Sequence, residues 1–211
     1  MMELLTIALP KGRILKESLD LLKKAGVDCY KIDEKSRKLI FVLEKSNMKF
    51  FLAKPLDIPT YVEYGAADLG IVGKDILMEE SRDVYELLDM GIGHCRLVVA
   101  GPKHIKEYPT NLKIATKFPR ITENYFLESG RQVEVIKLNG SVELAPMLNL
   151  ADKIVDIVST GVTLEKNNLT EHEQIAEITA RLIGNKVSFR LKAPMIDNLI
   201  NNLSSIIGRG E

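Results

Sequence analysis

The sequence predicts an α/β fold with largely parallel sheets. Short runs of Val, Ile and Leu recur along the chain, and segments whose apolar residues follow helical spacing separate them. Glycine turns stand between several of these strands and the helices that follow. Regular alternation of strands and helices is typical of parallel sheets whose faces are covered by helices.

Composition limits the classes of partner. Apolar residues make up 45% of the 211-residue chain and charged residues 27%, which is typical of a globular protein. A chain of this length forms one large domain or two small ones. Lys plus Arg and Asp plus Glu each total 29, so the formal net charge is zero. We therefore expect no nucleic-acid partner and no binding to an acidic membrane.

Targeting and redox signals point to the cytoplasm. The amino-terminal Met-Met-Glu is not followed by the basic and apolar regions of a secretory signal. No apolar run approaches the roughly 20 residues of a membrane span. The two cysteines, Cys29 and Cys95, lack C-x-x-C spacing, and the three histidines are scattered. We expect a cytoplasmic protein that needs no disulfide, membrane span or histidine metal site.

The first half of the chain is expected to begin with a strand, a turn and a helix. Apolar residues from Ile14 to Ala25 fall on one helical stripe, and Gly26 is suited to end it. Asp57 is a suitable N-cap for a second helix, with Pro59 in its first turn. We expect strands at residues 4–9, 39–43, 50–53, 68–72 and 84–89, and a short helix up to residue 80.

The second half follows Gly91-Ile92-Gly93, the best candidate hinge in the sequence. Ser141 is a candidate cap for a helix, although Pro146 requires that this helix start later or be irregular. We expect strands at residues 94–101, 113–116, 133–138, 154–158 and 174–183, and helices at 117–129, after Ser141, after Thr163 and at 189–207.

The stretch from Glu143 to Leu164 is the most informative part of the chain. It contains a β-branched strand, Ile154 to Val158, with Asp156 inside it. An acid within such a strand breaks the local pattern, as functional residues often do. The turn that follows, Ser159-Thr160-Gly161-Val162-Thr163, offers hydroxyls and backbone N–H groups for an anion. The alternative is an acid at the solvent end of a strand, followed by an ordinary turn.

A second candidate anion site is the basic turn Pro10-Lys11-Gly12-Arg13. It stands between a strand and the amino-terminus of a helix, where backbone N–H groups, the helix dipole and two cations favour phosphate. The alternative is a solvated surface turn, which often carries lysine and arginine. Arg37, taken alone, indicates a loop cation.

Long ordered motifs link these sites. They are L-P-K-G-R near the start, P-L-D-I-P-T-Y-V-E, G-A-A-D-L-G-I-V-G-K-D, K-I-A-T-K-F-P and the 143–164 stretch. Together they make the whole chain resemble the short form of ATP phosphoribosyltransferase, the enzyme that opens histidine biosynthesis. The resemblance implies two α/β lobes of mainly parallel sheet, similar to a type II periplasmic binding protein. The lobes would be residues 1–90 plus 179–211 and residues 91–178, with the last helix on the first lobe.

The resemblance also implies a reaction and its partners. Adenine N1 of ATP attacks the anomeric carbon of phosphoribosyl pyrophosphate, and pyrophosphate leaves with Mg²⁺. The substrates, and not protein ligands, are expected to carry the metal. The short form implies catalytic dimers within a hetero-oligomer, whose regulatory subunit resembles histidyl-tRNA synthetase.

Roles follow from the resemblance, one motif at a time. Ser159, Thr160, Gly161, Val162 and Thr163 are expected to bind the 5-phosphate. Lys11 and Gly12 are expected at the pyrophosphate or the ATP phosphates, Lys54 adds positive charge, and Asp75 lies at the ATP side. Arg13, Arg37 and Asp156 are the expected catalytic residues, with Asp156 at the ribose hydroxyls or the metal shell.

Two positions depart from the family pattern. Ser159 stands where the family more often has an acid, and Lys54 stands where arginine is more usual, so a point charge replaces a planar fork. The role of Glu143 stays open between helix capping and ligand contact.

Two other functions fit the same motifs. One is a solute-binding module of similar fold without chemistry, against which the missing secretory signal counts. The other is a phosphoribosyltransferase acting on another base. Replacing ATP with free adenine, orotate or nicotinate would separate the second alternative from the first interpretation.

Overall fold

The computed structural model describes residues 4–33, 38–103 and 111–208. The chain divides into two compact units: unit 1 is Met1–Gly93 with Thr179–Glu211, and unit 2 is His94–Ile178. From the sequence, we expected the chain to cross to the second lobe at residue 91 and to return to the first at residue 179. Each unit contains one sheet with helices on its faces, so the α/β class is confirmed.

The sheet of unit 1 has the order β2-β3-β1-β4-β11-β5. Its centre, β3-β1-β4, is parallel, whereas β2, β11 and β5 pair antiparallel. The expectation of mainly parallel sheets was therefore wrong outside this centre. For β2 the reason is that the turn Glu44–Ser46, which leads to β3, is too short for a parallel crossover. The strands are β1 Leu5–Pro10, β2 Ile40–Leu43, β3 Met48–Ala53, β4 Leu69–Gly73, β5 Tyr85–Asp89 and β11 Ala180–Gly184.

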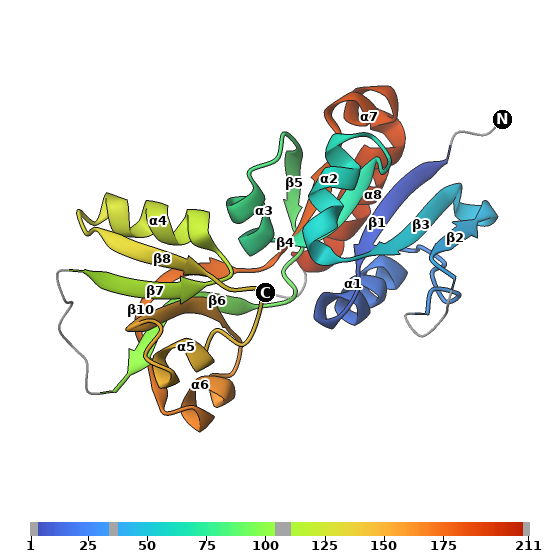
Figure 1. The fold of residues 1–211 in the computed structure, drawn as a ribbon. Helices are drawn as coiled ribbons and strands as arrows, with labels where there is room; N and C mark the ends of the chain where they lie inside the picture. Colours follow the sequence, from blue (N-terminus) through green and yellow to red (C-terminus); the bar gives the residue numbers. More distant parts are fainter. Residues whose placement is uncertain (1–3, 34–37, 104–110, 209–211) are drawn as a thin grey trace. The chain divides into compact units, whose positions relative to one another are not determined.

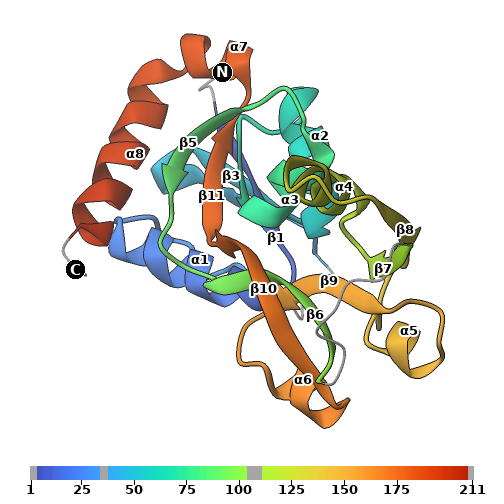
Figure 2. The same ribbon diagram turned by 90° about the vertical axis from the view of Figure 1, so that its left-hand side faces the viewer.

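Helices cover both faces of this sheet (Figure 2). One face packs on α1 and α8 through a core that includes Leu22, Phe50 and Leu199. The other packs on α2 and α3 through a core that includes Ile58 and Ile76. The helices of unit 1 are α1 Arg13–Lys24, α2 Ile58–Glu63, α3 Lys74–Glu80, α7 Lys186–Leu191 and α8 Ala193–Ile207, with a 3-10 turn Pro55–Asp57 before α2.

Two expected elements near the carboxyl end are divided. The expected strand 174–183 is two strands, β10 ending at Ile178 in the sheet of unit 2 and β11 starting at Ala180 in that of unit 1. The expected helix 189–207 is likewise α7 and α8, separated at Lys192. Pro194 suits the first turn of a new helix and cannot donate a backbone hydrogen bond within an older one.

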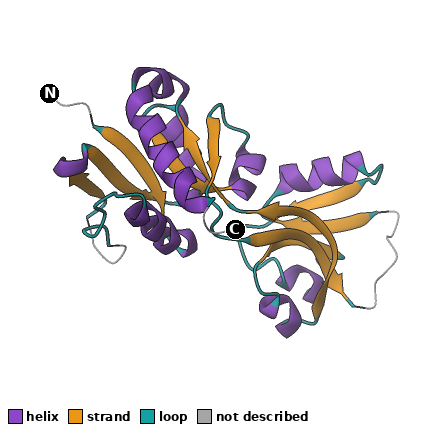
Figure 3. Ribbon diagram, turned by 180° about the vertical axis from the view of Figure 1, so that it is seen from behind, coloured by secondary structure: helices purple, strands orange, loops and turns teal. Residues whose placement is uncertain are grey.

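The sheet of unit 2 has the order β10-β6-β9-β7-β8. Its centre, β8-β7-β9, is parallel, whereas β6 pairs antiparallel with both β9 and β10. Helix α4 lies on one face, and α5 and α6 lie on the other (Figures 1 and 3). The elements are β6 Cys95–Pro102, β7 Leu112–Thr116, α4 Pro119–Glu128, β8 Val133–Lys137, α5 Leu144–Met147, β9 Lys153–Val158, α6 Val162–Lys166 and β10 Leu169–Ile178.

Two expected helix caps do not form with their side chains. Asp57 precedes α2 but makes no capping hydrogen bond through its carboxylate. Helix α5 is a single turn that starts after Glu143 and not after Ser141, and it contains Pro146. This agrees with the later, irregular start that the proline predicts.

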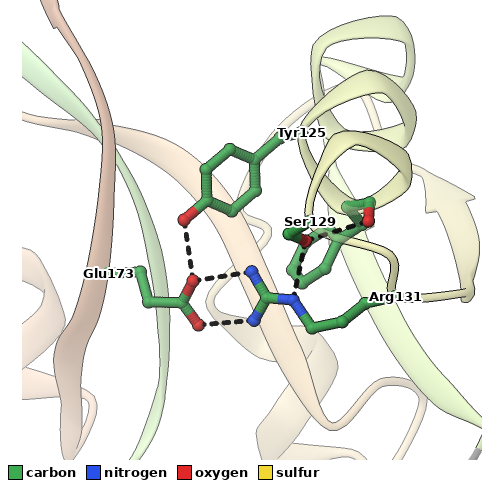
Figure 4. A network of polar contacts seen from close by, with 5 residues as sticks. Tyr125, Ser129, Arg131 and Glu173 are labelled. Carbon is green, nitrogen blue, oxygen red and sulfur yellow. Dashed lines mark hydrogen bonds and ion pairs between the residues drawn. The ribbon is translucent and has the colours of Figure 1, made fainter.

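A polar network joins the α4 side of unit 2 to β10 (Figure 4). The guanidinium of Arg131 donates to both carboxylate oxygens of Glu173, at 2.9 and 2.8 Å, and to the hydroxyl of Ser129 at 2.8 Å. The hydroxyl of Tyr125 donates to Glu173 at 2.7 Å. A bidentate pair of this kind fixes the orientation of both side chains.

The two parallel centres create places for ligands. In each, a first strand, β1 or β7, has later parallel strands on both sides, so the chain order reverses beside it. Ligands of open α/β sheets bind outside the carboxyl ends of the strands at such a reversal. Among the helices of the described residues, none has the length and hydropathy to cross a membrane.

Candidate active site

A cavity of about 210 Å³ lies at the carboxyl end of β9 in unit 2. It brings together Asp156 with most of the hydroxyl-rich turn that the sequence singled out. Its lining residues are Glu143, Asp156, Ile157, Val158, Ser159, Thr160, Gly161, Thr163 and Leu164. Val162 is not among them, and its side chain is 47% exposed at the start of α6.

The turn between β9 and α6 has the backbone of an anion cradle. Gly161 takes φ 80°, in the left-handed region that glycine adopts without strain, and it precedes the first residue of α6. The first N–H groups of a helix have no partner within it, so they remain available to a ligand. Ser159 and Thr160 are exposed and add hydroxyls at the same place. This loop, residues 159–163, is called the phosphate loop below.

Asp156 is half-buried in the cavity and does not lie at a solvated strand end. Burial raises the pKa of its carboxyl, and the charge of Glu143 raises it further. The backbone N–H of Ile157 and the charge of Lys117 act in the opposite direction. Alternation along β9 places Ile154 and Val158 on the same face as Asp156, and both belong to the core.

Two charged residues act on Asp156: the sequence analysis left the role of Glu143 open and assigned no role to Lys117. Glu143 lines the cavity and makes no side-chain cap for α5, so its position favours ligand contact over capping. Lys117 follows β7, whose Thr116 pairs with Val155 of β9. A lysine directly after a strand, in K-I-A-T-K-F-P, was the available signal for it.

An ion pair lies next to Gly161 of the phosphate loop. The guanidinium of Arg96 donates to both carboxylate oxygens of Glu171, at 2.7 and 3.3 Å. A Cβ at Gly161 would lie 3.8 Å from that carboxylate. Sequence reasoning missed this pair, because 75 residues separate its members.

In unit 1, Lys11 and Lys54 line one cavity of about 460 Å³. They follow β1 and β3, which are parallel neighbours, and the N–H of Lys11 donates to the carbonyl O of Ala53 at 2.9 Å. The rings of Phe51 and Tyr61, both in the lining, meet edge to face with centroids 5.2 Å apart. Two cations beside aromatic carbon suit a ligand with a flat ring and phosphate groups.

The other expected residues of unit 1 lie outside this lining. Gly12 precedes α1 with φ 91°, and Arg13 is the exposed first residue of that helix, with its guanidinium directed towards Gly93. Asp75 is 8% exposed in the first turn of α3, and its carboxylate fills the space that a side chain at Gly73 would need. Arg37 lies outside the described residues.

Comparison with known proteins decides the family. The family model described as ATP phosphoribosyltransferase, HisG, matches residues 54–205. The chain belongs to the ATP phosphoribosyltransferase family. An ATP phosphoribosyltransferase of Geobacillus sp. (strain WCH70) is 55% identical over 204 residues, covering 97% of this chain and 99% of its own length. That of Bacillus subtilis (strain 168) is 52% identical over 205 residues, covering 97% and 96%.

Solved structures agree with the family and with the fold. The ATP phosphoribosyl transferase (HisG:HisZ) complex from Thermotoga maritima contains a chain with TM-score 0.83 and 36% identity, covering 99% of this chain and 100% of that one. A substrate-binding protein of an amino acid ABC transporter has TM-score 0.61 at 13% identity, which supports the fold alone. The expected similarity to periplasmic binding proteins is confirmed. As a family member, the chain is a phosphoribosyltransferase of histidine biosynthesis.

The cavity of unit 2 contains carboxylate oxygens of the kind that Mg²⁺ prefers. Glu143 and Asp156 present carboxylate oxygens beside the phosphate loop, and Mg²⁺ prefers such oxygens together with substrate phosphates. Within residues 4–33, 38–103 and 111–208, no group of three or more acidic, histidine or cysteine side chains could hold a metal ion by itself.

Proposed function

We propose that this chain transfers the phosphoribosyl group of phosphoribosyl pyrophosphate to N1 of ATP and releases pyrophosphate. The observation that carries the proposal is the cavity of unit 2, in which a half-buried acid and a hydroxyl-rich loop at a helix start line one space. A phosphorylated sugar needs both groups: donors for phosphate and a carboxylate near the ring.

In unit 2, the phosphate loop binds the 5-phosphate of the sugar. The backbone N–H groups that precede and open α6 donate to phosphate oxygens, and the hydroxyls of Ser159, Thr160 and Thr163 add further donors. Asp156 and Glu143 face the ribose. Their negative charge favours the transition state, in which the anomeric carbon becomes positive as its bond to pyrophosphate breaks.

In unit 1, the lysines bind the nucleotide. Lys11 and Lys54 contact phosphate groups, and the apolar wall that contains Phe51 and Tyr61 packs against the adenine ring. Arg13 and Arg37 add positive charge for ATP or pyrophosphate. Asp75, buried at the start of α3, holds the turn after β4 at the ATP side.

The chain needs no nucleophilic side chain for this reaction, because adenine N1 is the nucleophile. Its residues bind and orient two substrates and adapt the local charge to the transition state. Glu143 and Asp156 would lie near Mg²⁺ that arrives on the substrate phosphates, and the metal would neutralise charge on the leaving pyrophosphate.

We further propose that the chain acts as a dimer within a hetero-oligomer that contains a regulatory subunit. The support is the Thermotoga maritima relative, which was solved in a complex of two kinds of chain. The expected regulatory subunit resembles histidyl-tRNA synthetase.

The test is pyrophosphate release from the purified chain with ATP and phosphoribosyl pyrophosphate, measured with and without the regulatory subunit. We expect release only when both substrates are present. Free adenine, orotate and nicotinate, each replacing ATP, serve as controls for another base. Sugar binding without pyrophosphate release, even with the regulatory subunit added, would instead support a binding module.

A further inference from the structure

The carboxyl ends of β7 and β9 form the ligand-binding edge of unit 2. The chain passes from β7 through α4 to β8 on one side of β7, and then through α5 to β9 on the other. The order of strands therefore reverses between β7 and β9, and ligands bind at such reversals. The phosphate loop follows β9. The segment that follows β7 begins with Lys117.

The backbone of Lys117 is held in place while its side chain is exposed. The hydroxyl of Thr116 donates to the carbonyl O of Val155 at 2.8 Å and accepts the N–H of Phe118 at 2.9 Å. Pro119 then opens α4. These bonds fix the residues on both sides of Lys117, so its amine extends from a rigid base.

Lys117 and Asp156 lie close to each other at the carboxyl ends of the neighbouring parallel strands β7 and β9. Thr116, the last residue of β7, pairs with Val155, so Lys117 directly follows β7 where Asp156 directly follows Val155 on β9. Their charges interact, because the ammonium of Lys117 lowers the pKa of Asp156 against the raising effect of burial. The other charge that acts on Asp156 is that of Glu143, while its partner on β6 is the apolar Val98.

The cavity needs a cation if its ligand carries several phosphates. Its lining contains Glu143 and Asp156. Among the described residues of unit 2 that line the cavity, none is a lysine or an arginine. The N–H groups of the phosphate loop serve one phosphate. A second phosphorylated position on the same sugar would lie beside two carboxylates, so positive charge from a nearby side chain, in addition to Mg²⁺ on the substrate, would stabilise it.

We propose that Lys117 binds the diphosphate group on the anomeric carbon of the phosphorylated ribose, while the phosphate loop binds the 5-phosphate. This role rests on the proposed function. When the new bond from N1 to the anomeric carbon forms, the carbon–oxygen bond to diphosphate breaks and its electron pair leaves with the diphosphate. The ammonium of Lys117 stabilises that growing negative charge and transfers no proton.

The test compares two sugar phosphates that differ in the second anionic group. Phosphoribosyl pyrophosphate and ribose 5-phosphate are titrated by calorimetry into the wild-type chain and Lys117→Met. We expect the affinity for phosphoribosyl pyrophosphate to fall on the order of tenfold to a hundredfold, which corresponds to one charged hydrogen bond, and that for ribose 5-phosphate to change less than about twofold. Turnover should fall as well.

Two further variants separate this role from general electrostatics. Lys117→Arg keeps the charge and should restore most of the lost affinity. Lys113→Met removes an exposed lysine from β7, the strand that precedes Lys117, where it pairs with Glu134, and should leave both affinities unchanged. Far-ultraviolet circular dichroism checks the fold of each variant.

Suppose that Lys117→Met lowers the affinity for both sugar phosphates equally, or for neither, and that the wild-type chain still releases pyrophosphate. That result would overturn the role of Lys117 and leave the proposed function standing. A wild-type chain that binds neither sugar phosphate and releases no pyrophosphate would overturn the proposed function itself. The two failures are therefore distinguishable in one series of measurements.

Discussion

The Nζ of Lys192 lies 2.8 Å from Oδ2 of Asp68, although 124 residues separate them in the chain. The same carboxylate oxygen accepts the N–H of Thr6 at 2.7 Å, and Lys192 also donates to the carbonyl O of Leu4 at 2.9 Å. Both side chains are largely buried, with 14% and 8% exposed. The pair thus joins the start of the first strand to the segment between the last two helices.

Breaking this pair should destabilise unit 1. Asp68→Asn leaves the charge of Lys192 buried without its counter-ion, which typically lowers the free energy of unfolding by about 3–5 kcal/mol. Urea unfolding at pH 7 measures the change. Asp83→Asn, which removes the exposed ion pair with Lys186, is the matched control and should cost less than about 1 kcal/mol. Similar losses in the two variants would contradict a special contribution from the buried pair.

Asp156→Asn should stabilise the fold and weaken activity. Burial raises the pKa of Asp156 in the folded state, so its ionised form opposes folding at pH values above that pKa. The stabilisation should be present at pH 7 to 8 and should shrink as the pH falls through the folded-state pKa. Thermal unfolding across pH measures it. A variant that is less stable than the wild type at pH 8 would contradict this account.

The pH dependence of turnover should report the same carboxyl. If the reaction needs ionised Asp156, kcat/KM falls as the pH decreases through its raised pKa. Glu143→Gln removes a neighbouring negative charge, so it should move that acid limb to lower pH. Steady-state kinetics over a pH series measures the shift. Movement of the limb to higher pH would show that Glu143 does not act on Asp156 through its charge.

Gly161→Ala should impair phosphate binding without unfolding the protein. Gly161 has φ 80°, and a non-glycine residue in this region costs about 1–2 kcal/mol. Because the nearest atom to an added Cβ is 3.8 Å away, the cost is backbone strain and not collision. The loop should relax and bind ribose 5-phosphate more weakly in calorimetry. Gly140→Ala, with open space and no positive φ, is the control. Equal affinity in both variants would exclude a required backbone shape.

Local pattern was sufficient to predict much of the fold and the phosphate loop. The strand at 154–158 and the glycine turn after it depend on neighbouring residues, because β-branched side chains favour extended backbone and glycine permits the left-handed turn. The same holds for the first helix, whose apolar stripe faces the core of unit 1. Family motifs then indicated which of these turns carry function.

Contacts between distant segments could not be predicted in the same way. The sequence analysis predicted one strand at 174–183, but the chain leaves one sheet at Ile178 and enters another at Ala180. Antiparallel pairing at the sheet edges depends on which strands meet, which periodicity does not record. Lys117 and the Arg96–Glu171 pair became visible only when strand pairing set their neighbours.

By itself, the sequence determined most of the kinds of element, their order and the two glycine turns for which anion binding is proposed, because each is decided by residues close together in the chain. Only the tertiary structure decided which charged side chains surround the half-buried Asp156. The register of β7 beside β9 and the packing of α5 set the positions of Lys117 and Glu143, and the energy of a charge depends on its neighbours in space and on its burial.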